Sequence, residues 1–111
     1  MPRDYKVYLE DILTAIGKIN RFIAGMTRDA LSRDDKTLDA VVRNLEIIGE
    51  AVKQLPEHIS TNHPEVDWKK IAGLRDILIH AYFGVDLEIV WDIIQNKLPV
   101  FGKQIELILA E

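Results

Sequence analysis

Four long segments of this chain carry apolar residues at steps of three and four. The first stripe consists of Tyr5, Leu9, Ile12, Leu13, Ile16, Ile19, Ile23 and Met26. The second consists of Leu38, Val41, Val42, Leu45, Ile48, Val52 and Leu55. This spacing places the apolar side chains on one face of a helix. It predicts one helix that ends near Gly25 and Thr27, and another that ends at Pro56, where proline stops the pattern. Residues 28–36 between them are expected to be a loop or a single helical turn.

Prolines and turn-forming residues fill the next segment, PEHISTNHPEVD, which predicts a loop over residues 56–67. Asp67 is a suitable N-cap for a third helix. The apolar face of that helix consists of Trp68, Ile71, Leu74 and Leu78.

The C-terminal part of the chain continues the helical pattern. Gly84 follows the third helix, and Asp86 can cap a fourth that runs from Leu87 to about Lys97. Pro99 either starts a fifth helix or kinks the fourth. The sequence shows no alternating strand pattern, so we expect an all-α fold. An antiparallel helical bundle of four to five helices, in one domain over residues 1–111, would bury these stripes.

Composition limits the class of protein and its compartment but does not indicate a function. With 48% apolar and 29% charged residues, the chain resembles an ordinary globular protein rather than a disordered one. It has no cysteine, which excludes disulfides and thiolate metal sites. No apolar run approaches the roughly 18 residues needed to cross a bilayer, and the charged N-terminus lacks the apolar core of a signal peptide. We therefore expect a cytoplasmic protein that does not associate with membranes.

The net charge of −4 argues against general affinity for nucleic acid, because non-specific binding depends on neutralising phosphates. An RNA-directed role would need a concentrated local basic site, which dimer symmetry could double.

One segment, GLRDILIHAYFG, concentrates chemically active side chains as Arg75, His80 and Tyr82, with the spacing R-x4-H-x-Y. This pattern resembles the HEPN ribonuclease motif. In its R-x4-H-x-Y form it resembles the HepT toxins that pair with minimal nucleotidyltransferase (MNT) antitoxins. The blocks RNLEIIGEAVKQLP and HPEVDWKKIAGLRDILIHAYFGVD are similar to the same family, so the resemblance covers essentially the whole chain.

The resemblance implies a HEPN-like bundle that cleaves RNA without a metal or cofactor, at a site formed across a homodimer. Elementary chemistry agrees, because histidine, with a pKa of about 6.5, can move protons near neutral pH. The guanidinium of Arg75 suits the charge of the transition-state phosphate. A cyclic 2′,3′-phosphate and a 5′-hydroxyl are the expected products. The motif supplies a single histidine, His80, so chemistry that moves two protons favours a dimeric site. The resemblance further implies an MNT partner that neutralises the toxin by transferring AMP from ATP to Tyr82.

Helix geometry adds an independent expectation about the motif. At about 100° per residue, Arg75 and Tyr82 share nearly one face, whereas His80 would lie about 140° from Arg75. Either the helix distorts or ends near Ile79, or the site is completed across a symmetric interface.

Supporting residues are open to two interpretations each. Asp76, next to Arg75, either orients Arg75 or His80, or is simply solvated. Lys69 and Lys70 either bind phosphate together with Arg75 or form a solvated lysine pair.

Two acidic residues on the second predicted helix are further candidates. Glu46 and Glu50 lie one turn apart and either face the motif or belong to an exposed helix surface. Two histidines of the predicted loop, His58 and His63, lack further ligands of a metal site, so no metal is expected.

A second function remains open. In this alternative the chain is a non-catalytic nucleotide- or substrate-binding subunit that accompanies a nucleotidyltransferase. Arg75, Lys69 and Lys70 would then hold a nucleotide phosphate. A third alternative is a helical dimerisation module, which would have no need of His80.

Overall fold

The computed structural model describes residues 4–78 and 87–111 of the chain, and within these ranges it contains helices and no strand. The all-α expectation is confirmed. The elements, in order, are α1 (Tyr5–Phe22), α2 (Arg28–Ser32), α3 (Asp35–Lys53), α4 (Glu57–Asn62), α5 (Trp68–Ala72), α7 (Leu87–Asp92), the π-helix η1 (Ile93–Lys97) and α8 (Leu98–Leu109). Residues 74–78 are also helical. His80, Tyr82, Gly84 and Asp86 lie outside the described residues.

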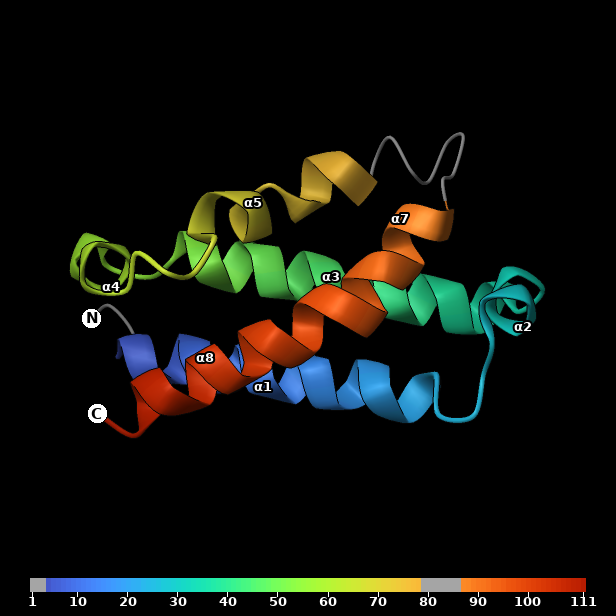
Figure 1. Ribbon diagram of the computed structural model, residues 1–111, viewed down its shortest axis with the longest axis horizontal. Helices are drawn as coiled ribbons and strands as arrows, with labels where there is room; N and C mark the ends of the chain where they lie inside the picture. The colour runs from blue at the N-terminus through green and yellow to red at the C-terminus, as the bar shows by residue number, and fades with distance from the viewer. Residues whose placement is uncertain (1–3, 79–86) are drawn as a thin grey trace.

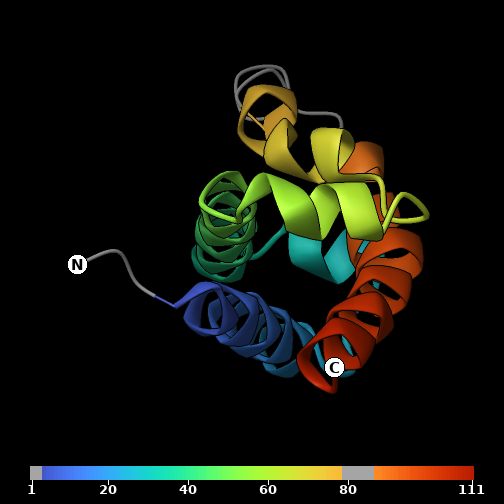
Figure 2. The same cartoon turned by 90° about the vertical axis from the view of Figure 1, so that its left-hand side faces the viewer.

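The two longest helices, α1 and α3, pack side by side in opposite directions, and α2 turns the chain between them (Figure 1). The α5 helix packs on α3, and α8 returns along α1, so that α1 begins and α8 ends at the same end of the molecule. Seen from that end, α1, α3, α8 and the segment from α4 onward surround a common interior (Figure 2). This arrangement is an antiparallel helical bundle.

Aliphatic side chains from all the long helices fill this interior, as the predicted stripes require. The largest fully buried ones are Leu9, Ile12, Ile19, Leu31, Leu45, Ile48, Leu78, Leu98, Ile105, Val41 and Val90. Among the described residues Asn44 is the only buried polar one, and its amide donates a hydrogen bond of 2.8 Å to the carbonyl of Ala40. No helix in the described ranges is long and apolar enough to cross a membrane.

Side-chain caps define where four helices begin. The side chains of Asp4, Thr27, Asp34 and Asp67 accept hydrogen bonds from backbone N–H groups in the first turns of α1, α2, α3 and α5. Such caps satisfy donors that have no partner within the helix. The predicted cap at Asp67 is confirmed, with a distance of 3.3 Å to the amide of Lys70.

The structure corrects the predicted loop over residues 56–67. Residues Glu57–Asn62 form α4, which Pro56 precedes and which buries Ile59. Proline is compatible with a helix start because its missing N–H is not needed there. Only Pro56 and residues 63–67 of the predicted loop remain irregular.

The third predicted helix is also not continuous. It ends at Ala72 and resumes at residue 74 after a turn at Gly73, whose N–H donates to the carbonyl of Lys69 at 3.0 Å. Helical structure continues without a break from α7 through the π-helix η1 into α8, with helical backbone angles at Lys97 and Leu98. Pro99 thus lies within one continuous helical segment, directly after the irregular turn η1, rather than at the start of a separate helix.

Candidate functional site

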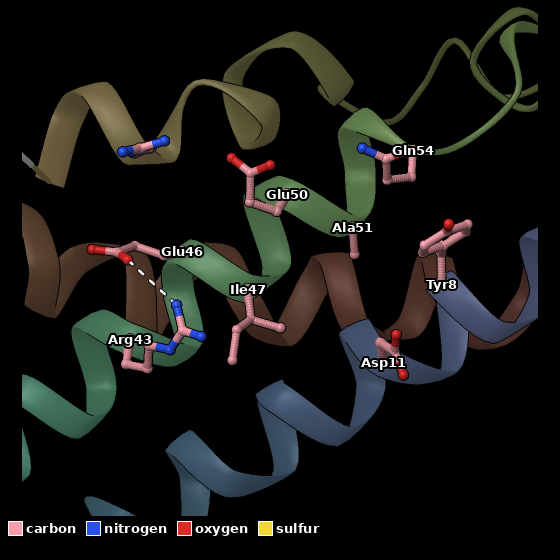
Figure 3. Close-up of a pocket in the computed structure, with 9 residues that line it drawn as sticks. Tyr8, Asp11, Arg43, Glu46, Ile47, Glu50, Ala51 and Gln54 are labelled. Atoms are coloured by element: carbon pink, nitrogen blue, oxygen red, sulfur yellow. Dashed lines mark ion pairs between the residues drawn. The ribbon is translucent and has the colours of Figure 1, made fainter. Parts of the chain in front are cut away.

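An open pocket of about 400 Å³ lies where α1, α3 and residues 74–78 meet. We call it the arginine pocket. Its lining residues are Tyr8, Asp11, Arg43, Glu46, Ile47, Glu50, Ala51, Gln54 and Arg75. Figure 3 shows that Arg43 and Glu46 lie toward one end of it, and Gln54 and Tyr8 toward the other.

Arg75 is the one residue of the predicted R-x4-H-x-Y motif that the structure describes. Its side chain is exposed, and within the described residues it makes no ion pair or hydrogen bond. A guanidinium group in this state has all five of its N–H donors available to an anion. The placement of the other two motif residues, His80 and Tyr82, lies outside the described residues.

Glu46 and Glu50 line the same pocket as Arg75. They thus share a pocket with Arg75, the described residue of the motif, and their side chains are also 37% and 51% exposed, so both interpretations agree with the structure. Each also has a cation on its own helix: Arg43 lies 3.9 Å from Glu46, and Lys53 lies 3.5 Å from Glu50. These are exposed pairs of the kind that contribute little to stability, so both carboxylates remain chemically accessible.

The remaining predicted residues lie elsewhere. Asp76 is exposed and does not line the arginine pocket. Lys69 lines a smaller cavity of about 180 Å³ between α3 and α5. Lys70 lines a mostly apolar cavity of about 410 Å³ between α5 and the η1–α8 segment. The structure thus brings Arg75 together with Glu46 and Glu50, and not with Lys69 or Lys70.

Four polar residues of the pocket were not singled out in the sequence: Tyr8, Asp11, Arg43 and Gln54. A signal exists for Arg43 and Gln54, which with Ile47 and Glu50 recur at steps of four, three and four and so share one face of a helix. No such spacing links Tyr8 or Asp11 on α1 to them. That face is polar and lies beside the apolar stripe of α3. It carries charges of both signs, as the solvated surface of an ordinary helix does, so the sequence alone does not mark this face as part of a pocket.

The two histidines of the predicted loop over residues 56–67 do not form a metal site. His63 contacts the carboxylates of Glu65 and Glu111, at 3.5 and 3.2 Å, while the ring of His58 stacks edge-on against Tyr5. Within the part of the chain that the structure describes, no group of three histidine or acidic residues could hold a metal ion.

The chemistry available in the arginine pocket is therefore that of a cation and nearby carboxylates. A guanidinium can bind a phosphate through two parallel hydrogen bonds and can stabilise charge that develops on it. A carboxylate that lies within hydrogen-bonding reach of a hydroxyl group is able to accept a proton from it.

Comparison with known proteins places the chain in a family. The model of a family described as ribonuclease HepT-like matches residues 12–108. A Methanocaldococcus jannaschii protein named as a candidate RNase is 49% identical, over all of this chain and 93% of its own length. A Thermococcus cleftensis protein named as a candidate ribonuclease HepT is 46% identical, over 89% of this chain and 90% of its own. A Caldanaerobacter subterraneus protein named as a candidate RNase is 44% identical, over 94% and 93%. No solved structure gives a significant match. The chain belongs to the HepT-like ribonuclease family.

Proposed function

We propose that this chain is a metal-independent endoribonuclease that acts as a homodimer and serves as the toxin of a toxin–antitoxin pair. Membership of a ribonuclease family supports the activity. The structural observation that carries the proposal is Arg75, an exposed arginine that lines an open polar pocket and has no ion pair among the described residues. A side chain in that state can receive the phosphate of a substrate.

In the proposed reaction a base removes the proton of an RNA 2′-hydroxyl, and the 2′-oxygen attacks the adjacent phosphorus. The bond from phosphorus to the 5′-oxygen breaks, and an acid protonates that oxygen as it leaves. The products are a 2′,3′-cyclic phosphate and a 5′-hydroxyl. His80 moves protons and Arg75 binds the phosphate charge. A two-fold dimer brings two such pairs together, which supplies both a base and an acid.

Regulation is proposed to act through Tyr82. A nucleotidyltransferase of the MNT type would catalyse attack of the Tyr82 hydroxyl on the α-phosphorus of ATP, with pyrophosphate as the leaving group and loss of the phenol proton. The AMP groups would bring negative charge to the region of Arg75 and repel RNA.

An RNA-cleavage assay in EDTA, with intact-mass measurement of protein made with and without the nucleotidyltransferase, tests the proposal. We expect cleavage by the unmodified protein and loss of cleavage when the mass increases by AMP units. A protein that binds nucleotide but never cuts RNA would instead be the non-catalytic subunit of the alternative interpretation.

A further inference from the structure

The arginine pocket is longer than a single phosphate needs. Arg43 of α3 and Gln54, the C-cap of α3, lie near its two ends and are eleven residues apart, which corresponds to about 16 Å along the helix axis. A stacked strand of nucleic acid advances only about 3.4 Å per nucleotide. The pocket can therefore contact several consecutive nucleotides.

We propose that Arg43 is a second phosphate-binding residue, which holds a phosphate neighbouring the one at Arg75 in a single-stranded RNA that lies along α3. The inference rests on the proposed function and adds a substrate-binding residue and a substrate class to it. Arg43 and Arg75 are far apart in sequence, yet they line one pocket. They supply the two positive charges of this pocket, beside the carboxylates of Asp11, Glu46 and Glu50.

Arg43 is available for this role. Its side chain is 72% exposed, and within residues 4–78 and 87–111 its one ion pair joins Nη1 to the Glu46 carboxylate at 3.9 Å. Such a long, exposed pair contributes little energy. The guanidinium therefore keeps its N–H donors for a phosphate.

The remaining lining residues favour a single strand in one position. Tyr8 provides an aromatic ring at the end of the pocket opposite Arg43 (Figure 3), and bases outside a duplex stack on such rings. Asp11, Glu46 and Glu50 repel phosphates from the rest of the pocket. Phosphates are thereby confined to the two guanidinium groups, which fixes the register of the strand.

Binding of a short 2′-O-methyl RNA, which cannot be cut because it lacks a free 2′-hydroxyl, tests the role of Arg43 apart from catalysis. We expect Arg43→Ala in the full-length protein to weaken binding about tenfold, the range of a hydrogen bond to a charged group. The slope of log affinity against log salt should fall by about 0.7, the value for one phosphate contact on a single strand. Arg33→Ala removes the same charge from an exposed residue outside the pocket and should change neither quantity. Circular dichroism checks the fold, and Arg43→Gln provides a second variant.

A cycle that combines the variant with a neutral methylphosphonate at single positions of the RNA locates the contact. In the wild-type protein, neutralising either of two neighbouring phosphates should weaken binding. In Arg43→Ala, one of these two positions should lose its effect while the other keeps it. Equal sensitivity of the wild type and the variant at every position would overturn the inference.

The outcomes separate this inference from the proposed function. If the wild-type protein cuts RNA but Arg43→Ala binds like Arg33→Ala, the role of Arg43 is wrong and the ribonuclease assignment stands. If the wild-type protein neither binds nor cuts RNA, both fail.

Discussion

Gly49 of α3 lies against the carbonyl of Ile71 in α5 so closely that a Cβ atom on Gly49 would be 3.3 Å from that oxygen. The same Cβ would be 3.7 Å from the carbonyl oxygen of Ala72 and 3.7 Å from the Cβ of Leu74. Gly49 lies between Glu46 and Glu50 on α3, and Arg75 directly follows Leu74. The absence of a side chain at Gly49 thus allows the backbone that leads to Arg75 to pack closely on α3.

Gly49→Ala should therefore fail to stabilise the protein, although alanine is favoured over glycine inside a helix by about 1 kcal/mol. The extra methyl group meets backbone atoms, which can move only if α5 and residues 74–78 shift. Gly17→Ala in α1 is the matched control, because nothing lies within 4 Å of its Cβ position. Urea unfolding should show a gain of about 0.5–1 kcal/mol for Gly17→Ala. An equal gain for Gly49→Ala would contradict this account of the contact.

Arg75→Ala should lower the rate constant of RNA cleavage by about 10²–10³, the range for loss of one group that stabilises transition-state charge. Arg75→Lys should recover little, because an ammonium group lacks the planar fork of donors. Arg21→Ala, an exposed arginine of α1 outside the pocket, is the control for loss of charge.

His80→Ala should abolish cleavage with the fold intact. Activity that survives His80→Ala, or that requires a divalent metal, would show the mechanism to be wrong.

Tyr82→Phe should cut RNA at a nearly normal rate and escape neutralisation by the nucleotidyltransferase. A phenol with a pKa of about 10 suits neither an acid nor a base at neutral pH, whereas its hydroxyl is a suitable acceptor for AMP. Co-expression, growth measurement and mass spectrometry check the prediction. If the variant still gains AMP, the acceptor is another residue; if it is inactive from the start, Tyr82 has a catalytic or structural role.

Asp34 should make the stability of α3 depend on acid pH. Its carboxylate accepts hydrogen bonds from the Thr37 hydroxyl at 2.7 Å and the Thr37 amide at 3.0 Å, and these lower the pKa of Asp34. Because the folded-state pKa lies below the ordinary value, the stabilisation is present above the ordinary pKa of about 3.9 and is lost as pH falls through the lowered one. Urea midpoints should show Asp34→Ala less stable than wild type at neutral pH, with a gap that narrows in acid. Asp39→Ala, at an exposed position of α3 that caps no helix, should show no such narrowing.

The sequence predicts the two long helices because α1 and α3 are long enough for their stripes to repeat over several turns. It fails at α4, where six residues bury only Ile59 and offer no period to detect. It also fails at the break after Ala72, since Ile71, Leu74 and Leu78 keep a helical spacing across the turn at Gly73. Short elements are set by tertiary packing and local turns, which leave little trace in periodicity.

The residues of the candidate site also include some that the sequence indicates and some that it does not. Arg75 belongs to a motif that can be read along the chain, and Glu46 and Glu50 could be proposed from their spacing on one helix. Helical spacing places Arg43 on one face with Glu50, but it does not show that this face meets Arg75. That relation, like the position of Tyr8, depends on how α1, α3 and residues 74–78 pack together. Helical periodicity gives the face of each helix but not the neighbour that this face meets.

Because the lining of the arginine pocket comes from three separate stretches of chain, any molecule bound there joins them. A ligand that binds only the folded state raises the free energy of unfolding, by about 2.7 kcal/mol at a concentration one hundred times its dissociation constant. Occupancy of the pocket is thereby coupled to the resistance of the protein to heat and proteolysis. The protein with an empty arginine pocket would then unfold and be degraded more readily than the protein with a ligand bound there.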